Sequence, residues 1–157
     1  GVQTCALPIL KIIVLPKLNA KNFTSDVPWA AISISTYGDW PILNKCQQVG
    51  LMQLAYADAD SQEMVDEVNS AFPNDPQVRL FAEKDAEDIL NFYLSVKDKI
   101  EVLLVHCEAG ICRSPATAAA LSLIFEGNDS EFFKVPFRPN LRVYRTILNK
   151  ANELGLI

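Results

Sequence analysis

Residues 105–115 read VHCEAGICRSP and bring two cysteines, one arginine and the chain's only histidine into one short stretch. Cys107 is a nucleophile when ionised, and the planar guanidinium of Arg113 can hold two phosphoryl oxygens at once. Gly110 lies between them and permits a backbone angle that a side chain resists. An apolar run at residues 102–106 precedes the stretch, and an alanine-rich run follows it. We therefore expect a turn from a buried strand into a helix.

Such a turn is suited to binding an anion, because backbone N–H groups and the positive end of the helix dipole converge there. A thiolate within a ring of N–H donors is stabilised, so we expect the pKa of Cys107 to fall well below the value of about 8.5 for a free thiol. The ionised Cys107 is then able to attack phosphorus, while Arg113 stabilises charge in the transition state. The sequence predicts a binding loop for a phosphate-sized oxyanion.

The residues His106-Cys107-x-x-Gly110-x-x-Arg113-Ser114 match HCxxGxxR[ST], the signature of the cysteine-dependent protein tyrosine phosphatase superfamily, and the chain is similar in size to the dual-specificity branch. The resemblance implies hydrolysis of a phosphomonoester through a phosphocysteine on Cys107, without a metal or other cofactor. It implies that Arg113 clamps phosphate, that Ser114 helps the sulfur to leave, and that His106 orients the loop. The resemblance also gives the residues that bind substrate: Glu108, Ala109, Gly110, Ile111, Cys112 and Arg113.

The family also uses an upstream aspartate, which protonates the leaving oxygen and then activates water. The apolar run at residues 51–57 leads into Asp58 and Asp60, and LAYAD resembles the family's pattern of a strand that ends at an aspartate. We predict that Asp58 is the general acid, with Asp60 as the second choice; the alternative for Asp58 is a turn residue that ends the strand. Asp75 is nearer to the cysteine in sequence, but Asn-Asp-Pro is typical of a turn.

Two further features have open interpretations. A cysteine directly before the arginine also occurs in low-molecular-weight tyrosine phosphatases, so Cys112 is either a partner that traps oxidised Cys107 as a disulfide or a small apolar filler. Residues 37–41 (YGDWP) are either a pocket wall or a packed surface turn. Residues 133–140 either flank the pocket, with Lys134, Arg138 or Arg142 in contact with substrate, or link two helices with solvated charges, and the linker is favoured.

The patterns along the chain predict one α/β domain, with a central, mostly parallel, twisted sheet of four to five strands flanked by helices. Strands are expected at residues 10–15, 30–35, 51–57 and 102–106, and helices at residues 63–71, 83–97, 114–125 and 140–154. In the helix at residues 83–97, Asp85 and Asp88 are expected to face solvent.

The composition of the chain argues against several classes of function and location. The chain has 157 residues, half of them hydrophobic, and a net charge of −5, which argues against a nucleic-acid partner. Four cysteines are too few for a secreted disulfide framework and favour a reducing compartment, the cytoplasm. The longest apolar run is too short to span a membrane. Residues 1–9 (GVQTCALPI) lack a basic segment and resemble translated sequencing adapter, so we expect a non-native tail before a catalytic domain at residues 10–157.

The expected substrate is a phosphorylated protein or a small phosphomonoester. The first alternative is a phosphoinositide or inositol phosphate phosphatase, although lipid-directed relatives tend to carry lysines in the loop, where this chain has the acidic Glu108. The second is a catalytically silent phosphate-binding module, whose usual mark is loss of the cysteine, the arginine or the acid. A sulfurtransferase also uses a loop cysteine, but the arginine spacing favours phosphate.

Overall fold

Strands and helices alternate along residues 10–157, the part of the chain that the computed structural model describes. The strands are β1 (Lys11–Pro16), β2 (Trp29–Ser35), β3 (Gln48–Ala55) and β4 (Val102–Cys107). The helices are α1 (Lys17–Ala20), α2 (Gln62–Ala71), α3 (Glu83–Val96), α4 (Arg113–Glu126), the 3-10 helix η1 (Ser130–Phe133) and α5 (Leu141–Glu153). The predicted α/β class, the strands and the helices are confirmed; the prediction for residues 1–9 lies outside the described residues.

The four strands form one sheet in the order β1-β4-β2-β3, and every neighbouring pair is parallel. Strand β4 lies between β1 and β2, and its residues Leu103, Leu104 and Val105 are completely buried. Burial on both faces explains why this strand reads as a continuous apolar run. Strand β3 lies at the edge, where its residues alternate between half-buried and exposed over most of its length.

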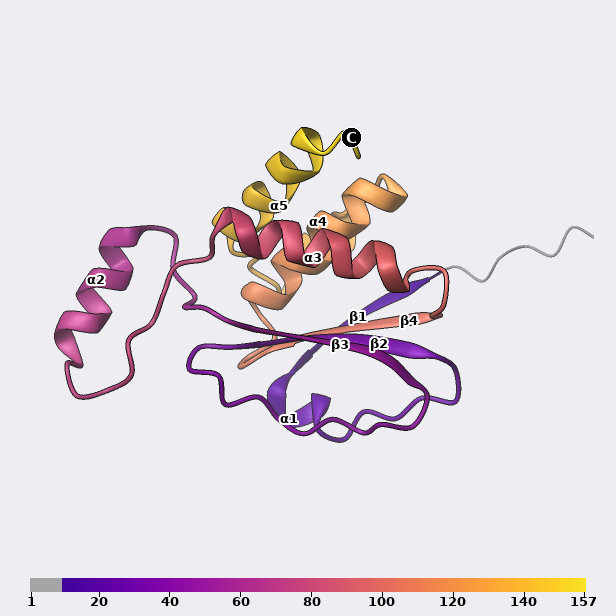
Figure 1. Ribbon diagram of the computed structural model, residues 1–157, viewed down its shortest axis with the longest axis horizontal. Coiled ribbons are helices and arrows are strands. Elements are labelled where there is room, and N and C mark those ends of the chain that lie inside the picture. The colour runs from indigo at the N-terminus through magenta and orange to yellow at the C-terminus, as the bar shows by residue number, and fades with distance from the viewer. Residues whose placement is uncertain (1–9) are drawn as a thin grey trace, which may run out of the picture.

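Helices α3, α4 and α5 cover one face of the sheet, while α1 and the neighbouring loops cover the other (Figure 1). The larger core lies beneath the three helices and includes Ile32, Val105, Leu121 and Ile147. A smaller core on the opposite face gathers around Trp29. None of the helices in residues 10–157 is long and apolar enough to cross a membrane.

Helix α2 projects from one end of the sheet (Figure 1). It packs through Val65 on a small apolar cluster that includes Ala57 and Val78. Ser61 caps its first turn by accepting a hydrogen bond from the Met64 amide at 3.2 Å. The helix therefore lengthens the connection between β3 and α3 without adding to the main core.

The prediction that Asp85 faces solvent is wrong, whereas Asp88 forms an ion pair with Lys84 on the outer side of α3. Asp85 is 5% exposed, and its carboxylate accepts two hydrogen bonds from the guanidinium of Arg79 at 2.7 and 2.8 Å. The same carboxylate accepts from the backbone N–H of Ala82 at 2.8 Å and so caps the start of α3. Helical periodicity does not reveal such a partner, because Arg79 precedes the helix.

Replacing Ile147 by Ala should lower the free energy of unfolding by about 2–5 kcal/mol, because this residue of α5 has a completely buried side chain in the larger core. Arg145→Ala, at an exposed position of the same helix, should change it by less than about 0.5 kcal/mol. Urea denaturation followed by circular dichroism measures both. Equal losses in the two variants would contradict the placement of α5 against the core.

Candidate active site

Cys107 is the last residue of β4 and is followed by the phosphate loop, which we define as residues 108–112 between β4 and α4. The thiol is 3% exposed. Its Sγ accepts a hydrogen bond from the Gly110 N–H at 3.3 Å and lies 3.1 Å from the Ser114 hydroxyl oxygen. The structure thus brings together a buried sulfur, a backbone donor and a hydroxyl, as expected for a sulfur that acts as nucleophile and later as leaving group.

The phosphate loop passes very close to β1. Gly110 has φ of +71°, and a Cβ atom at this position would lie 2.7 Å from the Pro16 nitrogen and 2.8 Å from the Leu15 carbonyl carbon. The backbone N–H of Lys17 donates to the carbonyl of Glu108 at 3.0 Å. Glycine is therefore required here both for the left-handed backbone and for the space.

Arg113 is the first residue of α4, and its guanidinium donates hydrogen bonds to residues that directly follow two other strands. Its Nη1 donates to the hydroxyl of Thr36, after β2, at 3.0 Å and to the carbonyl of Tyr56, after β3, at 2.8 Å. Within residues 10–157, hydrogen bonds engage only Nη1, so Nε and Nη2 are left to bind two oxygens of an anion. Sequence reasoning missed Thr36 and Tyr56, although Thr36 directly follows the strand predicted at residues 30–35 and Tyr56 lies within the one predicted at residues 51–57.

His106 lies entirely inside the sheet and is neutral. Burial lowers the pKa of its imidazole, and the hydrogen bond to the Cys107 carbonyl opposes this only in part. A carbonyl accepts only, so Nδ1 carries the proton and donates to the Cys107 oxygen at 3.3 Å. Nε2 is then the acceptor for the hydroxyl of Ser33, 2.5 Å away. The imidazole links β2 to Cys107, the residue directly before the phosphate loop.

Asp58, the predicted general acid, lies exposed beside the phosphate loop. It lines a pocket of about 310 Å³ together with Asp60, Cys112 and Asn140. One carboxylate oxygen, Oδ1, accepts a hydrogen bond from Asn140 Nδ2 at 2.8 Å. Asp75 lies instead in the turn that follows α2, where its backbone N–H donates to the carbonyl of Phe72. The structure therefore places Asp58 and Asp60 near the phosphate loop, whereas Asp75 lies at the end of α2, the helix that projects from the sheet.

Cys112 is half-buried in the phosphate loop, and Cys46, Cys107 and Cys112 are all free thiols. Burial and then the charge of Asp58 raise the pKa of the Cys112 thiol to about 11. A thiol must be ionised to attack an oxidised sulfur, so this environment slows disulfide formation at neutral pH. The disulfide between Cys107 and Cys112 stays a prediction.

An ionic network that sequence reasoning missed borders the phosphate loop at Glu108. The Lys17 ammonium donates to the Asp39 carboxylate at 3.2 Å and lies 4.0 Å from the Glu108 carboxylate. Hydrogen bonds from the Ser35 hydroxyl and then from Lys17 lower the pKa of Asp39. Lys17, Asp39 and Trp40 line a shallow groove, and a role of residues 37–41 as a wall for an aromatic ring of the substrate stays a prediction.

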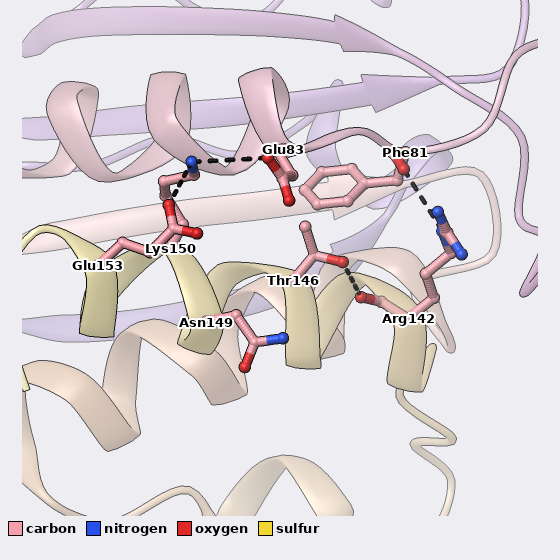
Figure 2. A pocket seen from close by; sticks show the side chains of 7 residues that line it. All are labelled: Phe81, Glu83, Arg142, Thr146, Asn149, Lys150 and Glu153. Atoms are coloured by element: carbon pink, nitrogen blue, oxygen red, sulfur yellow. Dashed lines mark hydrogen bonds and ion pairs between the residues drawn. The ribbon is translucent and has the colours of Figure 1, made fainter.

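A second cavity, of about 160 Å³, lies between α3 and α5 (Figure 2). Arg142 points into it and donates from Nε to the Phe81 carbonyl at 3.5 Å. Lys150 in the same cavity is paired with Glu83 at 3.8 Å and Glu153 at 2.7 Å. Arg142 and Lys150, the cationic residues of this cavity, therefore already have partners among the neighbouring residues.

No protein-family model and no curated protein matches the chain, but solved structures do. PTPMT1 in complex with PI(5)P is 13% identical over 92% of both chains, with a TM-score of 0.57. The fold is that of the tyrosine and dual-specificity phosphatases. Tk-PTP in its active form is 13% identical over 88% of this chain and 90% of its own, with a TM-score of 0.55. A human tyrosine phosphatase-like serine/threonine/tyrosine-interacting protein is 19% identical over 93% of both chains, with a TM-score of 0.54. The resemblance predicted from the signature is confirmed at the level of the fold.

Gly110→Ala should destabilise the protein more than Gly127→Ala. Both glycines have a left-handed backbone, with φ of +71° and +76°, so alanine should cost about 1–2 kcal/mol at either position. At Gly110 the new methyl group also meets the backbone of β1, whereas at Gly127 no atom lies within 4 Å. Urea denaturation should show the larger loss for Gly110→Ala. Equal losses would mean that the phosphate loop moves away from β1 at no cost.

His106 should make stability depend on pH in the mildly acidic range. Its folded pKa lies below the ordinary value of 6.5, so the unfolded chain binds a proton first as the pH falls. The free energy of unfolding should therefore decrease from pH 6.5 downward, toward the folded pKa. Because the chain has one histidine, His106→Asn should remove this component, and the difference between the two pH profiles isolates it. Parallel profiles between pH 5 and 7 would refute it.

Proposed function

We propose that the protein is a phosphomonoester hydrolase of the tyrosine or dual-specificity phosphatase type, acting through a phosphocysteine on Cys107 in the cytoplasm. One arrangement carries the proposal: the buried Cys107 sulfur lies 3.3 Å from the Gly110 nitrogen and 3.1 Å from the Ser114 hydroxyl oxygen. Arg113 follows directly after the phosphate loop with part of its guanidinium unengaged by residues 10–157. The proposed roles are those that the signature implies, with Asp58 as the general acid.

In the first step the phosphate loop and Arg113 hold the substrate phosphoryl group. The N–H groups of the loop and of the first turn of α4 donate to its oxygens, while Nε and Nη2 of Arg113 bind two of them. The thiolate of Cys107 attacks phosphorus as the bond to the leaving oxygen breaks. Asp58 gives its proton to that oxygen, so the leaving group departs as a neutral alcohol or phenol.

In the second step water hydrolyses the phosphocysteine. The Asp58 carboxylate takes a proton from the water as its oxygen attacks phosphorus, and the bond between phosphorus and sulfur breaks. The Ser114 hydroxyl, 3.1 Å from the sulfur, stabilises the thiolate that leaves. His106 supports both steps only indirectly, because its two ring nitrogens are engaged by Ser33 and by the Cys107 carbonyl.

The charges around the phosphate loop favour a substrate with one phosphate group. Asp39, Glu108 and Asp58 border the loop, and Lys17 is paired with the first two. A cluster of phosphates would meet these carboxylates, so we propose a phosphotyrosyl or related protein substrate before a phosphoinositide. PTPMT1 in complex with PI(5)P shares the fold and supports the lipid alternative in part. Because cysteine, arginine and aspartate are all present at the site, a silent binding module is the less favoured alternative.

The proposed mechanism predicts how much kcat each of three variants loses. The substrates are p-nitrophenyl phosphate and a phosphotyrosyl peptide, assayed with reductant and EDTA. Cys107→Ser should lose at least about 1,000-fold in kcat, because the nucleophile is removed. Arg113→Lys should lose about 100-fold, because lysine lacks the bidentate fork. Asp58→Asn should lose about 100- to 10,000-fold.

Two matched variants serve as controls for these losses. Asp60→Asn removes a carboxylate from the same pocket, and Cys46→Ser removes an exposed thiol; both should stay close to wild type. A near-normal Asp58→Asn together with an impaired Asp60→Asn would move the acid to Asp60. A folded wild type that hydrolyses a soluble phosphoinositide but no phosphopeptide would favour the lipid alternative. One that binds inorganic phosphate but hydrolyses none of these would favour the silent module.

A further inference from the structure

The segment at residues 134–140 is attached to the phosphate loop by its backbone, and it is more than the solvated linker that the sequence predicts. The N–H of Arg138 donates to the carbonyl of Ile111 at 2.8 Å, and the N–H of Asn140 donates to the carbonyl of Cys112 at 2.9 Å. These two carbonyls end the loop directly before α4. The segment therefore holds the outer edge of the phosphate loop while it leads into α5.

The side chain of Asn140 connects this segment to the predicted acid. Its Nδ2 donates to Asp58 Oδ1 at 2.8 Å and to the carbonyl of Ala59 at 3.1 Å. Its Oδ1 accepts from the N–H of Val143 at 3.1 Å and so caps α5. Two acceptors face the nitrogen and one donor faces the oxygen, so these contacts fix the orientation of the amide.

We propose that Asn140 is a positioning residue, which holds the Asp58 carboxyl group against the phosphate loop and selects the oxygen that transfers the proton. An amide N–H can only donate, so Asp58 Oδ1 must accept in both protonation states. When Asp58 is protonated, the proton is therefore on Oδ2, the oxygen that Asn140 does not engage. This inference rests on the proposed function, in which Asp58 is the general acid.

The same contact serves both chemical steps. Oδ2 gives its proton to the leaving oxygen as the phosphorus–oxygen bond breaks, and the resulting carboxylate takes a proton from the water that attacks the phosphocysteine. The hydrogen bond from Asn140 stabilises the carboxylate between these events. Because the backbone of Asn140 also holds Cys112, the acid and the phosphate loop share one anchor, and a shift in either is resisted by the other.

The decisive variant is Asn140→Ser, because serine keeps an acceptor that can cap α5 but lacks the amide donor that reaches Asp58. It should lose about 10- to 100-fold in kcat/KM on phenyl phosphate, whose leaving group needs a proton, and clearly less on p-nitrophenyl phosphate, because kcat/KM reports the step in which the leaving oxygen departs. Asn69→Ser is a matched control, since the Asn69 amide also holds a backbone carbonyl, at Val78. Asn69→Ser should show no dependence on the leaving group.

A double-mutant cycle separates positioning from structure. If Asn140 acts through Asp58, Asn140→Ser should cost almost nothing in an Asp58→Asn background. In Asn140→Asp, a carboxylate beside Asp58 should raise the pKa of the acid and move the alkaline limb of the kcat profile to higher pH. Equal losses with and without Asp58, or no dependence on the leaving group, would overturn the positioning role. A wild-type rate for Asp58→Asn would instead refute the acid assignment on which it rests.

Discussion

The close approach of the phosphate loop to β1 is the constraint on which the site depends. The loop can turn toward α4 only because residue 110 has no side chain, since a Cβ atom would lie 2.7 Å from the Pro16 nitrogen. The hydrogen bond from the Lys17 N–H to the Glu108 carbonyl ties the same two segments together. Strand β1 thus fixes the path of the phosphate loop, including the Gly110 N–H that donates to Cys107, although it contributes no side chain to the proposed chemistry.

The strand order places the other residues of the proposed site beside the phosphate loop. In the order β1-β4-β2-β3, the parallel strands all end at the same edge of the sheet. Cys107 ends β4, Thr36 follows β2, and Tyr56 and Asp58 follow β3. Arg113 draws these ends together through its hydrogen bonds to Thr36 and Tyr56. The arginine therefore stabilises this edge of the sheet through contacts that need no bound ligand.

The local patterns of the sequence predicted the elements and the core of the site, because both depend on residues that are neighbours in the chain. The signature around Cys107 and the apolar run of β4 are of this kind. Side-chain pairings that fall outside the periodic patterns were not predictable. Asn140 reaches Asp58 from the far end of the chain, and Asp85 is buried because Arg79 lies opposite it. Neither pairing leaves a periodic signal, so sequence reasoning assigned both regions to solvent.

Three aspartates near the sheet have environments that suit them to different roles. Asp85 is buried and committed to an ion pair with Arg79, which stabilises the start of α3. Asp39 is held in its ionised form by Ser35 and Lys17, so it is a poor proton donor at neutral pH. Asp58 forms no ion pair within residues 10–157, and Asn140 donates to it from a neutral amide. A neutral partner suits the proposed general acid, which gains and loses a proton in each turnover, because a permanent cation would favour the ionised form too strongly.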